Sequence, residues 1–213
     1  MDDKTLAGWR QDYTASGLTE EELAADPFSQ FRQWIKQAQE AGLYEPNAMV
    51  LTTVSGDGVP SSRMVLLKGF GPDGFVFFTN YASRKGTDLE ADGRCALLFP
   101  WHPLERQVRI EGTASRLDEP ASDAYFASRP RGAQLGAWAS PQSSVVSGRE
   151  VLDEEYDEVS RRFPGDVPRP PHWGGFRVVA ATVEFWQGRP GRMHDRLRFR
   201  RTPGGWTIER LAP

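Results

Sequence analysis

Cysteine, lysine and histidine are scarce in this chain of 213 residues. The one cysteine, Cys95, cannot form an internal disulfide, and its apolar setting R-C-A-L-L-F predicts a buried strand residue, because a reactive thiol needs an electropositive, partly exposed site. The three histidines, His102, His172 and His194, lack metal-ligand spacing. A nucleophile elbow, a Walker loop and a dinucleotide fingerprint are missing as well. The sequence therefore argues against thiol and metal chemistry and excludes the recognised phosphate loops.

Long apolar runs are also missing. No segment approaches the roughly 20 apolar residues that a membrane-spanning helix needs, and the N-terminus lacks the apolar region of a secretion signal. The net charge of -3 argues against a nucleic-acid or anionic-membrane partner, for which a basic domain is expected. We therefore expect a cytoplasmic protein with no nucleic acid and no membrane as partner, folded as a single domain over residues 1–213.

The order of patterns predicts a mainly β chain with flanking helices, an α+β protein whose antiparallel strands form a small barrel. A helix is expected to begin with Asp26 as its N-cap and Pro27 at its first position, and to stop near Gly42. The other elements are expected at the following residues: helices at 5–14, 83–92, 120–138 with a break at 129–130, and 147–163; strands at 48–54, 59–68, 74–80, 95–100, 104–117, 176–188 and 196–211.

The stretch from Arg63 to Lys85 combines two apolar runs, a Gly/Pro/Asp turn and basic residues at both ends, which is the pattern of a β-hairpin. Arg63, Lys68, Arg84 and Lys85 are able to converge on one anion, and a helix that follows Ser83 would add backbone N–H donors for a phosphate. An ordinary hairpin with solvated charges fits the local pattern equally well. Alternation along R-M-V-L-L-K puts Arg63 and Lys68 on opposite faces, which fits two anion sites.

A second basic and aromatic cluster runs from Trp186 to Arg196. Alternation along a strand would place Arg192, His194 and Arg196 on one face, where two guanidinium groups and an imidazole suit an anionic, aromatic substrate. For His194 alone, a structural hydrogen-bonding role is an equal alternative. With no evident nucleophile or metal, an enzyme with such anion sites is expected to use an organic cofactor.

A series of motifs, in order over nearly the whole chain, resembles the pyridoxamine/pyridoxine 5'-phosphate oxidases. These motifs are R-M-V-L-L-K, F-T-N-Y-A-S-R-K, L-L-F-P-W-H-P-L-E-R-Q-V-R, Y-F-A-S-R-P-R, G-A-W-A-S-P-Q-S-S, W-G-G-F-R, E-F-W-Q-G, H-D-R and the terminal E-R-L-A-P. The resemblance implies a homodimer of FMN-binding split β-barrels with FMN at the subunit interface, in which the strands from about residue 174 to 213 serve dimerisation and substrate binding.

The resemblance also implies the site residues. FMN would be bound by Arg63, Met64, Val65, Leu66, Leu67, Lys68, Phe78, Thr79, Arg84, Lys85, Gln107, Gln142, Ser143, Trp186 and Arg196. The substrate would be bound by Arg10, Tyr13, Lys68, Tyr125, Arg129, Ala133, Arg192 and His194, of which Arg192 and His194 would frame the reacting ring as catalytic residues. Arg10 and Tyr13 resemble a lid on the N-terminal helix. Some of these side chains would come from the partner chain.

The implied reaction is oxidation of pyridoxamine 5'-phosphate or pyridoxine 5'-phosphate to pyridoxal 5'-phosphate. A hydride would pass from substrate C4' to flavin N5, and O2 would reoxidise the flavin to give H2O2, with NH3 released from the amine substrate. One position departs from the family motif S-R-P-R-x-S, because Ala133 stands where a hydroxyl is expected. One neutral hydrogen bond is worth about 0.5–1.5 kcal/mol, so we expect weaker substrate binding and intact chemistry.

Two other functions remain open at this point. The first is a non-catalytic flavin-, haem- or pyridoxal-phosphate-binding module on the same barrel, which would have no use for a second set of substrate residues. The second is an enzyme that reduces another compound with a flavin or deazaflavin. That enzyme would have no use for Lys68, Tyr125 and Arg129 together.

Overall fold

The computed structural model describes residues 8, 9, 12–15 and 17–213. The chain forms two compact units. Unit 1 comprises Met1–Met49, Leu97–Glu111 and Ala181–Pro213, and unit 2 comprises Val50–Ala96 and Gly112–Ala180. Four strands continue from one unit into the other, so the units are not successive domains along the chain.

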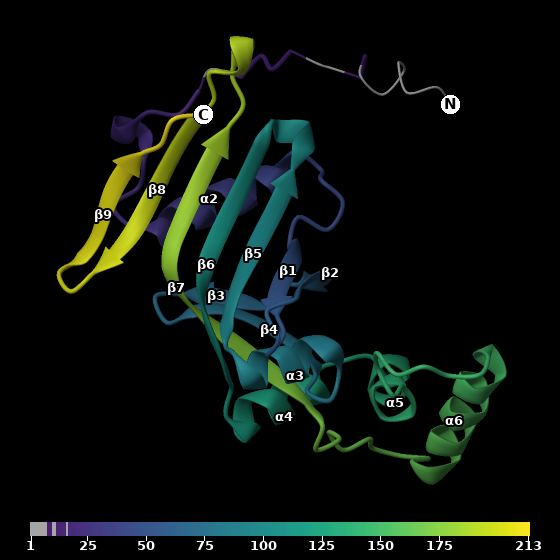
Figure 1. Cartoon of the computed structure of the whole chain (residues 1–213). Coiled ribbons are helices and arrows are strands. Elements are labelled where there is room, and N and C mark those ends of the chain that lie inside the picture. The colour runs from purple at the N-terminus through teal and green to yellow at the C-terminus, as the bar shows by residue number, and fades with distance from the viewer. Residues whose placement is uncertain (1–7, 10–11, 16) are drawn as a thin grey trace. The chain divides into compact units, whose positions relative to one another are not determined.

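The strands are β1 (Ala48–Val54), β2 (Pro60–Leu66), β3 (Gly69–Gly71), β4 (Gly74–Asn80), β5 (Arg94–Trp101), β6 (Arg106–Arg116), β7 (Trp173–Gln187), β8 (Asp195–Thr202) and β9 (Gly205–Arg210). They are hydrogen-bonded in the order β2-β1-β5-β6-β7-β4-β3, while β8 pairs with β7 and β9 with β8. The pairs β3–β4, β4–β7, β7–β8 and β8–β9 are antiparallel. The prediction of a mainly β, antiparallel chain with flanking helices is confirmed (Figure 1).

The helices are η1 (Glu20–Glu22), α2 (Pro27–Glu40), α3 (Arg84–Ala91), η2 (His102–Leu104), α4 (Glu119–Ala127), α5 (Arg131–Ala139), α6 (Arg149–Arg162) and η3 (Pro190–Arg192). In the described part of the chain, none of them combines the length and the apolar character that a membrane crossing requires. Half of the residues of the helix expected over 5–14 lie outside the described residues. The other half, residues 8, 9 and 12–14, lie in non-helical backbone.

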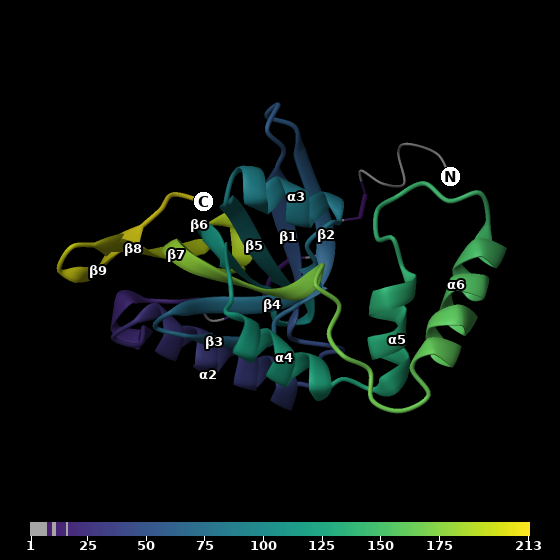
Figure 2. The ribbon, with the colours of Figure 1, turned by 90° about the horizontal axis from the view of Figure 1, so that it is seen from below.

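In unit 1, α2 begins as its sequence predicts. The Asp26 carboxylate accepts the backbone N–H groups of Phe28 (2.9 Å) and Ser29 (3.0 Å), and Pro27 needs no such acceptor. The apolar face of α2 then packs on the strands of the same unit, where the ring centroids of Trp34 and Phe185 are 5.2 Å apart. Figures 1 and 2 show α2 lying along one face of these strands.

In unit 2, the break predicted at residues 129–130 separates α4 from α5. Pro130 cannot continue a helix because its ring removes the N–H donor, so the chain restarts at Arg131. Helices α5 and α6 lie side by side (Figures 1 and 2). A buried cluster of Phe126, Leu135, Val159 and Trp173 joins these helices to β7.

Cys95 lies in β5, as predicted, and is half-buried. Burial raises the pKa of its thiol to about 12. The thiol therefore stays protonated at neutral pH, which fits a packing role for this side chain.

Two helical glycines provide a matched stability test. A Cβ atom at Gly86 in α3 would lie 2.2 Å from the Tyr81 carbonyl oxygen, whereas a Cβ atom at Gly136 in α5 would meet nothing within 4 Å. We expect Gly86→Ala to lower the free energy of unfolding by about 1–3 kcal/mol through this backbone clash. Gly136→Ala should raise it by about 0.5–1 kcal/mol, because alanine loses less entropy in a helix. Urea unfolding curves measure both, and equal effects would contradict the crowding at Gly86.

Candidate functional site

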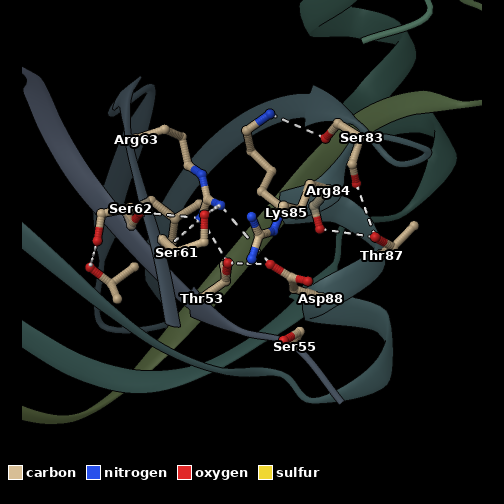
Figure 3. Close-up of polar contacts among 12 residues, drawn as sticks. Thr53, Ser55, Ser61, Ser62, Arg63, Ser83, Arg84, Lys85, Thr87 and Asp88 are labelled. Atoms are coloured by element: carbon tan, nitrogen blue, oxygen red, sulfur yellow. Dashed lines mark hydrogen bonds and ion pairs between the residues drawn. The ribbon is translucent and has the colours of Figure 1, made fainter. Parts of the chain in front are cut away.

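A basic cluster in unit 2 brings together Arg63 from β2 and Arg84 and Lys85 from the start of α3 (Figure 3). Burial lowers the pKa of Arg63 and the charge of Arg84 lowers it further, while Asp88 opposes both. Like charges stay this close only where neighbouring groups fix them or an anion neutralises them. Arg63, Arg84 and Lys85 therefore lie close to one another, and their convergence on one anion stays a prediction.

Arg63 is held in place by groups of its own unit. Its Nη1 donates to Thr53 Oγ1 (2.7 Å) and to the Ser61 carbonyl oxygen (2.9 Å), and its Nη2 donates to Ser61 Oγ (2.8 Å). Thr53 in turn donates to the buried carboxylate of Asp88 (2.6 Å), which lies 4.0 Å from Arg63 Nη2. The guanidinium is thus oriented before any ligand arrives, as Figure 3 shows.

Lys85 is the buried member of the cluster. Its Nζ donates to Ser83 Oγ (3.1 Å) and to Gln142 Oε1 (2.8 Å), so two of its three N–H groups have partners. Burial, assisted by the charge of Arg63, lowers the pKa of Lys85 to about 8. Ser83 also accepts the backbone N–H of Gly86 (3.4 Å) as the N-cap of α3. An ammonium group, a helix start and two guanidinium groups together suit a phosphate.

A cavity of about 500 Å³ opens beside this cluster, also within unit 2. Phe78 and Tyr125 stack in its wall with ring centroids 3.9 Å apart, and Phe78 and Trp173 stack at 5.6 Å. The predicted site residues in its lining are Met64, Val65, Leu66, Lys68, Phe78, Thr79, Lys85, Tyr125, Arg129 and Gln142. Most of the residues that line this cavity are thus ones for which the sequence predicted a binding role.

Arg129 is the unusual member of the cavity wall. Its guanidinium lies over the Trp173 ring, 4.5 Å from the centroid, and burial lowers its pKa. Its Nη1 is buried without a hydrogen-bond partner, the one such side-chain atom in the described part of the chain. A buried charged donor without a partner is costly. An anion in the cavity would remove this cost.

Some residues of this site were given no role by the sequence prediction. Ser128, Pro130 and Trp173 line the cavity, and Thr53 and Asp88 orient Arg63. Trp173 stands in the motif W-G-G-F-R and was detectable there, whereas Thr53 and Asp88 belong to a strand and a helix that meet only in the fold. Strand alternation also fails as a guide to Lys68, because β2 ends at Leu66.

Unit 1 carries a second, aromatic cluster. Tyr13 meets Trp186 and His194 edge to face, with ring centroids 5.7 Å and 5.3 Å apart, and Trp186 and His194 lie 4.6 Å apart. The Nδ1 atom of His194 accepts the backbone N–H of Arg189 (3.1 Å). This bond fixes the ring so that Nε2 is the nitrogen available to a ligand.

The prediction that Arg192, His194 and Arg196 share one face of a strand is wrong. Strand β8 begins at Asp195, and Arg192 belongs to η3 with a left-handed φ of 61°, so the three side chains do not alternate on one strand. Arg196 is in β8, where its Nε donates to Glu184 Oε1 (2.8 Å). This hydrogen bond raises the pKa of Arg196.

The remaining predicted site residues are less informative. Gln107 lies half-buried in β6, Ser143 is exposed with a φ of 74°, and Ala133 lies in the first turn of α5 without a polar side chain. Arg10 lies outside the described residues. Their predicted roles stay predictions.

The basic cluster and the ring-lined cavity of this antiparallel β protein are suited to an anionic aromatic ligand. Comparison with known families makes this specific. Residues 35–163 match the family described as pyridoxamine 5'-phosphate oxidase, and residues 173–213 match the pyridoxine 5'-phosphate oxidase C-terminal dimerisation region. The chain belongs to the pyridoxamine 5'-phosphate oxidase family.

Individual relatives agree with this assignment. A pyridoxine/pyridoxamine 5'-phosphate oxidase of Nocardioides sp. is 59% identical over 98% of this chain and 98% of its own length. The corresponding protein of Rubrobacter xylanophilus is 57% identical over 99% of this chain and 97% of its own length. The crystal structure of PhzG from Burkholderia lata 383, in complex with tetrahydrophenazine-1-carboxylic acid, superposes with a TM-score of 0.88 at 30% identity, covering 93% of this chain and 99% of that chain. The shared fold confirms the split-barrel prediction.

The lowered pKa of Lys85 predicts a pH-dependent affinity for phosphate monoesters. Above a pH of about 8 the Lys85 ammonium group of the free protein loses its proton and its positive charge. Because a bound anion is stabilised by this charge, the affinity for the anion should fall by up to about tenfold per pH unit. FMN is a suitable probe, because its fluorescence reports binding and its phosphate is already dianionic above a pH of about 6. Lys85→Met should bind more weakly at pH 7 and show no further loss above pH ~8. Parallel pH profiles for the two proteins would contradict this role.

Proposed function

We propose that this protein oxidises pyridoxamine 5'-phosphate and pyridoxine 5'-phosphate to pyridoxal 5'-phosphate, with FMN as cofactor and O2 as electron acceptor. The curated relatives that bear this activity in their names match the chain over nearly its full length. The single structural observation that carries the proposal is the buried, unpartnered Nη1 of Arg129 in a cavity that adjoins the basic cluster and shares Lys85 with it. One basic site suffices for a flavin phosphate, whereas an enzyme acting on a phosphorylated substrate needs two.

The basic cluster fits the phosphate of FMN. Arg63, Arg84 and Lys85 supply the charge, the N-terminus of α3 supplies backbone N–H groups, and Thr53 and Asp88 keep Arg63 oriented. The bound flavin would supply two-electron oxidation, taking a hydride from the substrate and passing the electrons to O2 as H2O2. Residues 64–68, Phe78, Thr79, Gln142 and Ser143 are assigned to the rest of this cofactor.

The cavity fits the phosphate of the substrate. Arg129 offers its free Nη1, Lys68 offers an exposed ammonium group, and Tyr125 offers a hydroxyl on a ring held by Phe78. Together they would fix the substrate by its phosphate end, so that the pyridine ring is presented to the flavin in one orientation. Ala133 cannot add a hydrogen bond here, which favours weaker substrate binding.

Unit 1 supplies the residues assigned to the rings. Tyr13, Arg192 and His194 are proposed to frame the substrate ring, and Gln107, Trp186 and Arg196 to border the flavin ring. Because residues 173–213 match a dimerisation region, we propose that the protein works as a homodimer with FMN at the subunit interface, where each chain completes the other's site. The contribution of these residues is orientation and charge, and the chemistry requires no strong general base.

The spectrum of the purified holoenzyme tests the proposed reaction directly. Anaerobic addition of pyridoxamine 5'-phosphate should bleach the bound flavin, and admission of O2 should restore the colour with formation of H2O2. A non-catalytic binding module would show an unchanged or merely shifted spectrum. Such a result would overturn the proposed oxidation while leaving cofactor binding intact.

Arg129→Met tests the assignment of the substrate phosphate. A hydrogen bond to a charged group is worth about 1.5–3 kcal/mol, so KM for pyridoxine 5'-phosphate should rise roughly 10- to 100-fold, with FMN affinity unchanged. Because Nη1 has no hydrogen-bond partner among the described residues, the melting temperature should not fall. Arg149→Met is the matched control, because Arg149 is an exposed arginine whose one ion pair within the described residues is with Asp153 on α6. Loss of stability without a change in KM would assign Arg129 a structural role.

A further inference from the structure

The backbone of residues 14 and 15 is held by one carboxylate. The Thr14 N–H lies 3.1 Å and 2.9 Å from Oε1 and Oε2 of Glu105, and the Ala15 N–H donates to Oε2 of the same side chain (3.0 Å). Thr14 and Ala15 are 91 and 90 positions away from Glu105 in the chain, and all three residues belong to unit 1. Two consecutive N–H groups on one carboxylate form charge-assisted hydrogen bonds, which are stronger than neutral ones. We call residues 13–15 the strap.

Glu105 is itself rigidly placed. It follows η2 in the turn between β5 and β6, in the left-handed conformation with φ 54° and ψ 37°. Its carbonyl oxygen accepts the N–H of Gly188 (2.7 Å) and the side-chain amide of Gln187 (3.0 Å) at the end of β7. A single residue thus ties the strap to the turn that follows β7.

The strap carries Tyr13 onto the aromatic cluster of unit 1. Tyr13 covers Trp186 and His194 edge to face at 5.7 Å and 5.3 Å. The approach is close, because a Cβ atom at Gly188 would lie 2.8 Å from Tyr13 Cγ and 3.0 Å from Glu105 Cβ. Tyr13 therefore depends on where Glu105 holds the two residues that follow it.

The chain beyond the strap has its own, separate anchor. The Leu18 N–H donates to Asp195 Oδ2 (2.9 Å), and Arg210 binds both Asp195 Oδ1 (2.6 Å) and Glu20 Oε2 (2.7 Å). Loss of the Glu105 carboxylate would leave these contacts in place. Its effect is thereby confined to the strap.

We infer that Glu105 is a positioning residue, whose carboxylate clamps the strap so that Tyr13 closes over the Trp186–His194 pair. This inference rests on the proposed function, in which Tyr13 and His194 frame the substrate ring. Glu105 touches neither ring itself and acts only through the backbone of Thr14 and Ala15. The clamp orders the strap before the substrate binds, so the entropy cost of ordering it does not reduce the binding free energy.

The test compares Glu105→Gln and Glu105→Gly with the same changes at Glu45. Glu45 is a matched control because it is also a left-handed glutamate, with φ 45°, and its exposed side chain has no hydrogen bond or ion pair within the described residues. Glycine suits both backbone positions, so folding is preserved while the carboxylate is removed. Glutamine keeps one acceptor oxygen and should give an intermediate effect.

Two readouts are taken on the FMN-loaded protein. Hydrogen exchange of the Thr14 and Ala15 amides should accelerate at least about tenfold in Glu105→Gly, which corresponds to the loss of about one charge-assisted hydrogen bond. KM for pyridoxine 5'-phosphate should rise about tenfold while kcat and FMN affinity stay near wild type, because an unclamped strap must be ordered on binding. The Glu45 variants should match wild type in both readouts.

Unchanged amide exchange in Glu105→Gly would show that no clamp exists and would overturn the inference. Faster exchange with an unchanged KM would also overturn it, because the strap would then have no role in substrate binding. If the wild-type protein fails to oxidise pyridoxine 5'-phosphate, the proposed function fails. The exchange data and the direct binding of pyridoxine 5'-phosphate to each variant then still decide whether Glu105 positions a binding residue.

Discussion

The crowding of positive charge at the start of α3 is the constraint on which unit 2 depends. Lys85 is buried next to Arg63, and burial together with that charge lowers the pKa of Lys85 to about 8. The neighbouring residues make this arrangement tolerable. Thr53 accepts a hydrogen bond from Arg63 and donates one to Asp88, which links this carboxylate to the guanidinium. Ser83 and Gln142 accept hydrogen bonds from the Lys85 ammonium group. The cations of this cluster outnumber the buried carboxylates beside them. Such an excess of positive charge favours binding of an anionic ligand.

The cavity and the cluster solve different problems with similar residues. The cluster uses hydrogen-bonded cations at a helix start, which favours a permanently bound phosphate. The cavity leaves Arg129 Nη1 without a partner beside a stack of aromatic rings, which favours a ligand that comes and goes. This difference is the physical basis for assigning the cluster to a cofactor and the cavity to a substrate. The family membership then specifies which cofactor and which substrate are proposed.

Unit 1 depends on carboxylates that act on backbone groups. Glu105 accepts from the strap, and Asp195 accepts from Leu18 and pairs with Arg189 and Arg210. Burial opposes ionisation of Asp195, but these hydrogen bonds outweigh it and lower the pKa of its carboxyl group. The described residues 14, 15 and 18 are thus held by Glu105 and Asp195, which come from a turn and a strand start far along the chain. This explains how Tyr13 reaches the aromatic cluster from non-helical backbone.

The sequence by itself determined the local elements and the kinds of residue in the site. Asp26–Pro27 set the start of α2, Pro130 separated α4 from α5, and the basic residues of the stretch 63–85 pointed to Arg63, Arg84 and Lys85, because capping, proline sterics and charge act over a few residues. The hairpin expected there is replaced by other pairings, since β2 pairs with β1 and β4 pairs with β3 and β7. Tertiary structure alone decided that Asp88 and Thr53 orient Arg63, that Arg129 Nη1 has no hydrogen-bond partner among the described residues, and that Glu105 holds residues 90 positions away. It also moved Arg192 off the expected strand face, because β8 begins only at Asp195. Such relations depend on which distant segments meet, and no local pattern encodes that.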